Sequence, residues 1–270
     1  MPSRNVTTSL RDFLTLVWWH MCHFVAYYVR VRRLRPSNQF FHKVVVIGDD
    51  FAAGIGDDLR LGSAGGGIAK YLETIVASDN KVHHTWAVVN AGVPGSTTAD
   101  WLVSSPKKYF ENVFTSRATS DASIVIILLG SAEIRKHSAA VGSEMYRNLV
   151  AICDTLRKKS KQVCLATIAS ACPLDTEMDN TSSAVNTALE QFCNSTSTEA
   201  APVVLGPRLD TYAFRRESAL SFDKYHFNSQ SYRQLAYNTA DFLIPMMTAV
   251  EWTIWKDQPS RVSYDKTLYD

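Results

Sequence analysis

The feature of this sequence that most constrains its fold is a series of five short apolar runs. They cover residues 43–47, 85–89, 123–129, 163–168 and 202–205. The runs are nearly continuous, whereas a strand with one face in water would alternate polar and apolar residues. Strands that are buried on both faces are typical of parallel sheets covered by helices, so the runs predict a parallel sheet.

Candidate helices lie between and after these runs, near residues 66–78, 98–114, 142–159, 181–193 and 228–249. The alternation of strands and helices predicts an α/β domain with right-handed crossovers. Ligands of such sheets bind at the carboxyl ends of the strands. We therefore expect functional residues in the loops that follow the apolar runs.

Composition excludes several classes of protein. Of the 270 residues, 46% are hydrophobic and 20% are charged, which excludes a disordered or fibrous chain. The net charge of +2 gives no strong field to attract nucleic acid, so no nucleic-acid partner is expected. The cysteines are odd in number and form no CxxC pair, which favours reduced thiols in a reducing compartment. They are Cys22, Cys153, Cys164, Cys172 and Cys193.

Residues 13–29 form a segment without any charged side chain, and an arginine cluster (Arg30, Arg32, Arg33 and Arg35) follows it. Seventeen helical residues span about 26 Å, slightly less than the roughly 30 Å hydrocarbon core of a bilayer. We predict a membrane anchor over residues 13–29, with the basic flank on the cytosolic or matrix side. The alternative is a buried or interfacial helix that packs on a partner, which His20 and His23 favour.

These patterns divide the chain into an N-terminal helix and basic linker (1–36), an α/β domain (37–250) and a C-terminal tail (251–270). The tail carries Trp252, Trp255, Tyr264 and Tyr269, and either packs on the parent domain or binds a partner. The glycine-rich residues 62–67 lack the GK[ST] of a phosphate-binding loop and are read as a flexible turn.

Four short motifs stand at strand ends or before the last helix. They are GDDFAAGIG at 48–56, NAGVPGSTT at 90–98, GSAE at 130–133 and DKYHFN at 223–228. Together they resemble the blocks GDSxxxG, NxGxxG, GxND and DxxHPN of the SGNH/GDSL hydrolase (esterase/lipase) family. The resemblance covers roughly residues 43–248.

The resemblance implies a three-layer α/β/α sandwich of flavodoxin-like type with a five-stranded parallel sheet. It also implies ester hydrolysis, often of lipids, acyl-thioesters or acetylated sugars, without metal or organic cofactor. In the family a serine attacks the carbonyl, a histidine takes its proton and an aspartate orients that histidine. By motif, the histidine is His226, its aspartate is Asp223 and the second-block oxyanion glycine is Gly95. The nucleophile position holds Asp50, and the oxyanion asparagine position holds Ala132.

The two departures affect catalysis directly. Loss of a triad serine costs about 10⁶ in kcat, and loss of one oxyanion donor costs about 10²–10³. We therefore predict a catalytically inactive or impaired protein with a vestigial triad. We expect it to act as a membrane-anchored accessory subunit among other protein subunits, in a compartment such as the mitochondrial inner membrane and matrix, or on the cytosolic face of a membrane.

Several alternatives remain open from the sequence. Asp50 could itself be a nucleophile toward a phosphoryl or halide substrate, fill the oxyanion hole with its carboxylate, or cap a helix. His226 and Asp223 could be a purely structural pair. A neighbouring serine (Ser63, Ser96 or Ser131) could replace the nucleophile, and Asp49, Asp50 and His226 could hold a divalent metal, although we expect none. The chain could also be an active membrane-associated ester hydrolase, or a module that binds lipid or carbohydrate.

Overall fold

The computed structural model describes residues 6–58, 66–136, 142–169 and 176–257. Its strands are β1 (Phe41–Gly48), β2 (Thr85–Asn90), β3 (Ile124–Leu128), β4 (Gln162–Leu165) and β5 (Val203–Leu205). They form one sheet in the order β2-β1-β3-β4-β5, and each pair of neighbours is parallel. The parallel sheet expected from the five apolar runs is confirmed.

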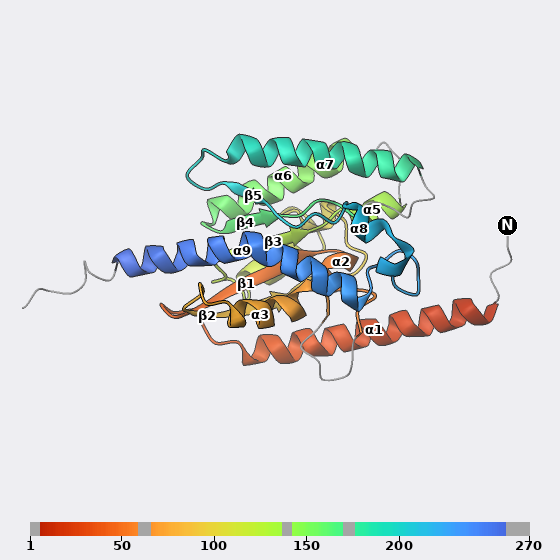
Figure 1. Cartoon of the computed structure of the whole chain (residues 1–270), viewed down its shortest axis with the longest axis horizontal. Helices are drawn as coiled ribbons and strands as arrows, with labels where there is room; N and C mark the ends of the chain where they lie inside the picture. Colours follow the sequence, from red (N-terminus) through yellow and green to blue (C-terminus); the bar gives the residue numbers. More distant parts are fainter. Residues whose placement is uncertain (1–5, 59–65, 137–141, 170–175, 258–270) are drawn as a thin grey trace, which may run out of the picture.

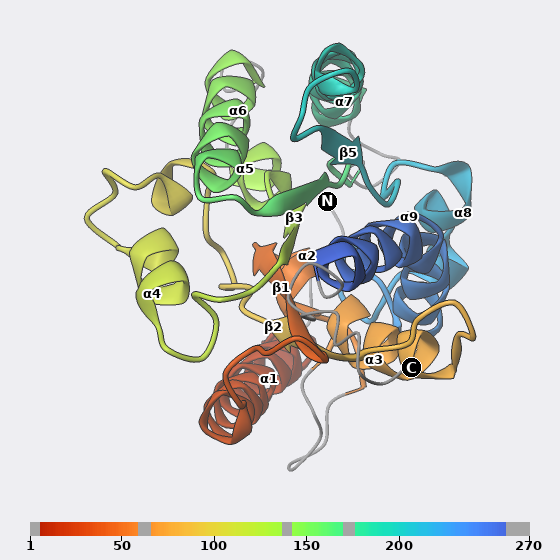
Figure 2. The same ribbon diagram turned by 90° about the vertical axis from the view of Figure 1, so that its left-hand side faces the viewer.

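The longer helices are α1 (Val6–Arg33), α3 (Ile68–Ser78), α6 (Gly142–Lys158), α7 (Thr176–Thr196) and α9 (Ser229–Asp257). The shorter ones are α2 (Asp50–Ala53), η1 (Ala99–Trp101), α4 (Tyr109–Thr115), α5 (Ser131–Lys136), α8 (Tyr212–Arg215) and η3 (Glu217–Ala219). Figures 1 and 2 show α3 and α9 on one face of the sheet, and α4, α6 and α7 on the other.

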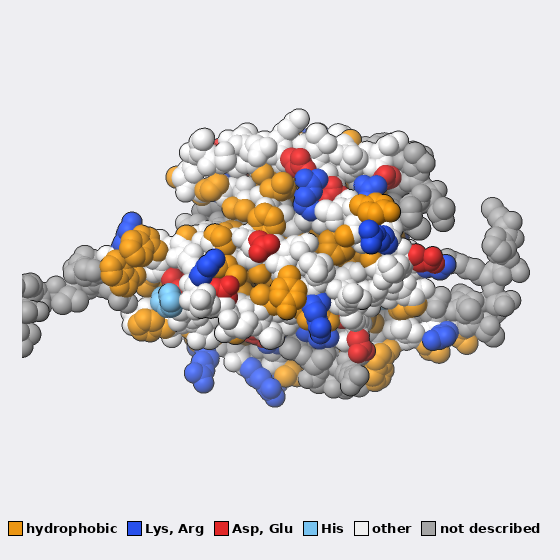
Figure 3. All heavy atoms as spheres, in the orientation of Figure 1, with side chains coloured by type: hydrophobic (Ala, Val, Ile, Leu, Met, Phe, Trp, Pro, Cys, Tyr) orange, Lys and Arg blue, Asp and Glu red, His pale blue; other side chains and the backbone are white. Residues whose placement is uncertain are grey.

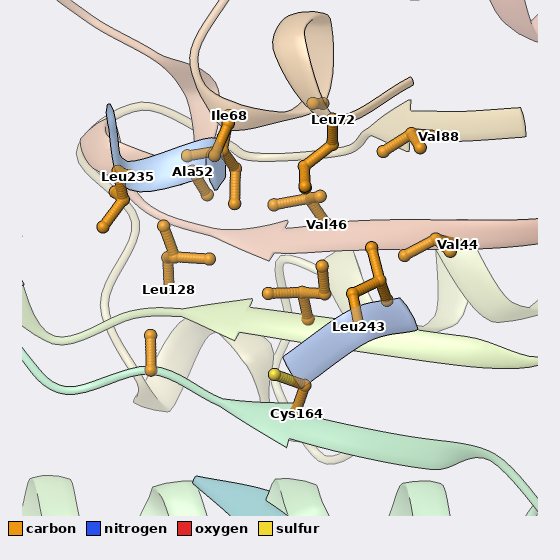
Figure 4. Packing of buried hydrophobic residues seen from close by; sticks show 14 of the residues in the cluster. Val44, Val46, Ala52, Ile68, Leu72, Val88, Leu128, Cys164, Leu235 and Leu243 are labelled. Atoms are coloured by element: carbon orange, nitrogen blue, oxygen red, sulfur yellow. The ribbon is translucent and has the colours of Figure 1, made fainter. Parts of the chain in front are cut away.

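Successive residues of β1 point to opposite faces of the sheet and so enter two separate cores. Val44 and Val46 pack with side chains of α3 and α9 such as Leu72 and Leu243 (Figure 4). Val45 and Ile47 pack instead with residues of α4, α6 and α7. This arrangement confirms the three-layer α/β/α sandwich, and both faces of the strands are buried as the unbroken apolar runs indicate.

Several predicted elements have different bounds in the structure; α7, for example, covers Thr176–Thr196 rather than 181–193. The continuous helix expected over 98–114 is wrong, because η1 and α4 are separated by a turn that contains Pro106 and the left-handed Lys108 (φ 55°). β4 ends at Leu165 rather than at residue 168, since the Thr167 N–H leaves the ladder for Pro207 O at 3.2 Å. The last helix continues to Asp257, past the predicted residue 249.

Helix α1 is 28 residues long, so it extends beyond residues 13–29 at both ends. One side of it lies against the domain near β2 (Figure 2), where Trp19 and Cys22 pack with Ala53 and Ile55. His23 Nε2 lies 3.1 Å from Gly92 O, and burial lowers the pKa of His23 to about 4. Among the described residues, no helix combines the length and the hydropathy that crossing a membrane requires.

Candidate functional site

The loops after β1, β2 and β3 meet the loop before α9 at the carboxyl edge of the sheet. Asp49, directly after β1, ties two of these loops together. Its Oδ2 accepts the N–H groups of Gly130, Ser131 and Ala132 at 3.0, 2.8 and 3.2 Å. Its Oδ1 accepts the Phe51 N–H at 3.1 Å. Burial and the neighbouring Asp50 carboxylate raise the pKa of Asp49 to about 7, against the effect of these hydrogen bonds.

Asp49, not Asp50, is the N-cap residue of α2. The alternative in which Asp50 caps a helix is therefore wrong, because the side chain that accepts a first-turn N–H belongs to the preceding residue. This leaves the Asp50 carboxylate available for contacts outside its own helix.

Asp50 lies at the centre of the site and is only 2% exposed. Its Oδ1 accepts the Gly95 N–H at 2.6 Å. Its Oδ2 accepts a hydrogen bond from Arg135 Nη2 at 3.3 Å and lies 3.4 Å from His226 Nε2. Burial opposes ionisation of Asp50, but His226, Arg135 and the Gly95 N–H together hold its pKa below the usual value.

His226 and Asp223 lie in the loop before α9 and contact each other directly. His226 Nδ1 is hydrogen-bonded to Asp223 Oδ2, and Asp223 Oδ1 accepts the N–H groups of Tyr225 and His226 at 3.0 Å each. Burial acts to raise the pKa of Asp223, but the His226 contacts lower it to about 2. Burial acts to lower the pKa of His226, yet Asp223 and Asp50 raise it above the usual value.

The structure thus brings together the Asp50, His226 and Asp223 side chains and the backbone N–H of Gly95. Ala132 is at the same edge, fully buried in the first turn of α5, with its N–H on Asp49 and a side chain that cannot donate a hydrogen bond. The adjacent Glu133 points elsewhere, because its carboxylate accepts from the Thr98 N–H and hydroxyl at 2.8 Å each.

Sequence reasoning missed two residues of this site. Arg135 comes from α5 and contacts Asp50, and its guanidinium lies over the ring of Tyr225 at 5.0 Å. The Tyr225 hydroxyl donates to Ser131 O at 2.8 Å. One signal was available: Arg135 is three residues after Ala132, which places both on one side of a helix.

The other candidate groups have structural partners. Ser96 Oγ donates to Gly48 O and accepts from the Trp101 indole, at 3.1 and 2.9 Å. Ser131 is buried beside Asp49, while Ser63 and most of the glycine-rich stretch (62–65) lie outside the described residues. Within the described ranges, no cluster of three or more His, Cys, Asp or Glu side chains could hold a metal ion.

A protein-family profile covers the loops of this site. The profile of the GDSL-like Lipase/Acylhydrolase family matches residues 46–234. This chain belongs to that family. The match includes Asp49, Asp50, Gly95, Asp223 and His226, so it contains every loop that contributes to the site.

Solved structures with the same fold include hydrolases of low sequence identity. An acetyl xylan esterase from Geobacillus stearothermophilus has a TM-score of 0.55 and 18% identity, over 76% of this chain and 96% of that one. The lipase Lip_vut3 from a goat rumen metagenome has a TM-score of 0.54 and 18% identity, over 73% and 95%. A putative lipolytic protein of the G-D-S-L family from Desulfitobacterium hafniense has a TM-score of 0.53 and 16% identity, over 77% and 98%. No curated protein matches the sequence.

The contact between Asp50 and His226 predicts that the Asp50 carboxylate affects the pKa of His226. In an Asp50→Asn variant, the pKa of His226 is expected to fall, because the Asp50 carboxylate is one of the groups that raise it. Titration of the His226 ring signals by NMR measures the change. Asp100→Asn, which removes a carboxylate paired with Lys107, should leave the His226 titration as it is in the wild type. An unchanged His226 pKa in Asp50→Asn would contradict the arrangement.

The raised pKa of His226 also makes the stability of the fold depend on pH. Because the folded-state pKa of His226 is raised, its pairing stabilises the fold fully below the unfolded-state pKa of about 6.5. That stabilisation is lost as the pH rises through the folded-state value. The pKa of Asp223 is lowered to about 2, so its contribution is lost instead as the pH falls from about 4 toward 2.

Proposed function

We propose that this GDSL-family protein does not hydrolyse esters and serves as an accessory protein at a membrane surface. The observation that carries the first part is the hydrogen bond from the Gly95 N–H to the Asp50 carboxylate at 2.6 Å. In the family pattern, the residue at position 50 attacks the substrate and the glycine N–H stabilises the oxyanion. In this protein the Asp50 carboxylate, at the nucleophile position, accepts the hydrogen bond of the Gly95 N–H. The oxyanion site is therefore filled by a side chain of the protein itself.

Electrostatics support this proposal. The pKa of Asp50 is below its usual value, so its side chain is a carboxylate at neutral pH. The oxyanion of a tetrahedral intermediate would form beside that negative charge, whereas esterases place hydrogen-bond donors there. Ala132 adds no donor. The missing serine alone accounts for a loss of about 10⁶ in kcat relative to an intact triad.

The retained His226–Asp223 pair has a structural use that needs no catalysis. It joins the loop before α9 to α2, since His226 contacts Asp50 and its ring lies 5.4 Å from the ring of Phe51. A histidine between two carboxylates is held in place by both, and here the two carboxylates raise the pKa of His226 above its usual value. The pair therefore has a role in this fold that does not depend on a serine nucleophile.

A second candidate function is hydrolysis with Asp50 as the nucleophile. The contact between Asp50 and His226 favours this second function, because His226 could activate water. Against it, both carboxylate oxygens are engaged and the side chain is almost fully buried, so a substrate would have to displace Arg135 or the Gly95 N–H.

The membrane-surface part of the proposal rests on α1. Leu10, Leu14, Val17, Met21, Phe24 and Tyr28, here called the outer stripe, are exposed large apolar residues. Their spacing of three or four residues places them on one side of the helix over about 27 Å. Figure 3 shows apolar and basic side chains along this edge of the molecule. Because the opposite side packs on the domain through Trp19 and Cys22, the helix fits a position in the bilayer interface rather than across it.

The compartment and further partners are part of the same proposal. Cys22, Cys153, Cys164 and Cys193 are buried free thiols, which supports a reducing compartment. Mitochondrial matrix and cytosol both meet that requirement. Other protein subunits of a membrane assembly are the proposed partners, and exposed aromatic residues at the end of α9, such as Trp252 and Trp255, fit such contacts.

Hydrolysis of a panel of activated acyl esters by the full chain tests the proposal. The wild type is expected to match both buffer and His226→Ala. Asp50→Ser, alone and with Ala132→Asn, tests whether the site still admits an ester once a nucleophile is restored. Activity in these variants alone would support the loss of catalysis through Asp50. Turnover by the wild type that His226→Ala abolishes would overturn the proposal and favour Asp50 as the nucleophile.

A further inference from the structure

A second site lies beneath α1, far from Asp50. It is a cleft of about 650 Å³ between the C-terminal half of α1, the linker after it and the first residues of β1 and β2. That volume is within the ~300–1,000 Å³ typical of small-molecule sites. Phe41 and Thr85 begin their strands, so the cleft is at the amino edge of the sheet, opposite the loops that hold Asp50.

The walls of this cleft are mainly apolar and its charges are all positive. Val25, Val29, Leu34 and Phe41 contribute apolar surface, and Arg30, Arg33 and Arg35 contribute guanidinium groups. No aspartate or glutamate lines it. A ligand that fits this combination carries an apolar chain and an anionic head.

The arginines of the cleft have N–H groups that could donate hydrogen bonds to an anionic head group. Arg30 is paired with Glu73 through Nη2, but its buried Nε has no hydrogen-bond partner. Arg33 and Arg35 are exposed, and neither forms an ion pair with a residue in the described part of the chain. Guanidinium groups bind phosphate and carboxylate through paired hydrogen bonds and lose less hydration than ammonium groups. Basic residues also favour a helix C-terminus, and Arg30 and Arg33 lie in the last turn of α1, whereas Arg35 lies beyond its end at Arg33.

The cleft adjoins the proposed membrane-contact surface. Val29, which lines the cleft, is exposed and directly follows Tyr28 at the end of the outer stripe. Tyr28 also lies beneath the guanidinium of Arg32 at 4.2 Å, so basic and apolar groups meet there. We propose that this cleft binds an anionic lipid, with its phosphate or carboxylate on the arginines and an acyl chain along Val25, Val29 and Phe41. The lipid would come from the bilayer on which α1 lies, so its source rests on the proposed function.

A soluble probe tests the cleft independently of any bilayer. Dodecyl phosphate, kept below its micellar concentration, is expected to raise the Tm of the full chain. Inorganic phosphate and the neutral dodecyl maltoside, each at the same concentration, should not. The Arg33→Gln/Arg35→Gln variant should lose the shift, and Val29→Trp should lose it while keeping every charge. The matched control, Arg147→Gln/Arg216→Gln, removes the same amount of charge from exposed sites elsewhere. Dodecyl phosphate should still raise the Tm of this control.

Vesicles test the source of the lipid. In sedimentation with phosphatidylcholine vesicles, added phosphatidic acid is expected to strengthen wild-type binding. Arg33→Gln/Arg35→Gln should reduce the binding to the acidic vesicles about thirtyfold, and the control pair should change it much less. Leu14→Ser/Phe24→Ser, which alters only exposed residues of the outer stripe, should abolish binding to both vesicle types.

The outcomes separate the two proposals. If the wild type does not sediment with vesicles, the proposed function at a membrane surface is wrong. The proposal for the cleft is tested separately, by the effect of dodecyl phosphate on the Tm. If dodecyl phosphate leaves the Tm unchanged, or protects Arg33→Gln/Arg35→Gln and Val29→Trp as well as the wild type, the cleft proposal is overturned. Equal protection by inorganic phosphate would also overturn it, because the apolar walls would then have no role.

Discussion

An Asp49→Ala variant is expected to lose about 4 kcal/mol or more of its free energy of unfolding. The carboxylate accepts four backbone N–H groups, from Phe51, Gly130, Ser131 and Ala132, in a region without solvent exposure. Each buried donor left without a partner costs about 1–3 kcal/mol. Urea unfolding followed by tryptophan fluorescence measures the loss.

A matched control shows whether burial is the cause. The Asp100 carboxylate also accepts a backbone N–H, from Thr97 at 2.9 Å, but it lies near the surface and pairs with an exposed lysine. Asp100→Ala is therefore expected to cost about 1 kcal/mol or less. Asp49→Asn keeps one acceptor oxygen and should fall between the two alanine variants. A loss below about 1 kcal/mol in Asp49→Ala would mean that the loops after β1 and β3 are not joined in this way.

Gly48→Ala is expected to prevent the chain from folding to a cooperative native state at 25 °C. Gly48 has φ +144°, and an added Cβ would lie 1.7 Å from Leu128 O, the acceptor of the Asp49 N–H. Neither β1 nor β3 can move away, because their ladder positions the whole centre of the sheet. We expect the resulting strain to exceed ~4–5 kcal/mol, a loss that few single substitutions reach. Many domains have a free energy of unfolding of about this size. Near-ultraviolet circular dichroism and urea titration report the loss.

Gly142→Ala is the matched control for that result. Gly142 is the first residue of α6, and an added Cβ would meet only side-chain methyl groups of Val185 and Thr181, at 3.3 and 3.4 Å. It is expected to change stability by no more than about 1 kcal/mol. Native stability in Gly48→Ala would contradict the close approach of the β1 and β3 ends.

The sheet was predictable because its strands are buried on both faces. A run such as 43–47 has to be apolar at every position, since Val44 and Val46 enter one core and Val45 and Ile47 the other. Helix bounds were harder to predict. The apolar residues of 98–114 fit a helical period, but Pro106 and the left-handed Lys108 interrupt the backbone between η1 and α4.

The location of the site followed from the rule that the carboxyl ends of parallel strands meet at one edge, whereas its residues were assigned from the resemblance to the SGNH/GDSL motifs. This rule places Asp50 near Gly95, and the motif before the last helix adds His226 and Asp223. The rule has no bearing on Arg135, which reaches Asp50 only because of how α5 packs on α2. Hydropathy likewise could not separate the two apolar sides of α1, since Trp19 packs on the domain whereas Phe24 is exposed.

The docking of α1 also has a consequence for synthesis on the ribosome. His23 contacts Gly92, which is made 69 residues later. At about 5–20 residues per second, the helix leaves the ribosomal tunnel roughly 3–14 s before its docking surface exists. During that interval the outer stripe and the side that carries Trp19 and Cys22 are both uncovered by the domain. Until the domain covers Trp19 and Cys22, both apolar sides of α1 are therefore open to contacts with other molecules.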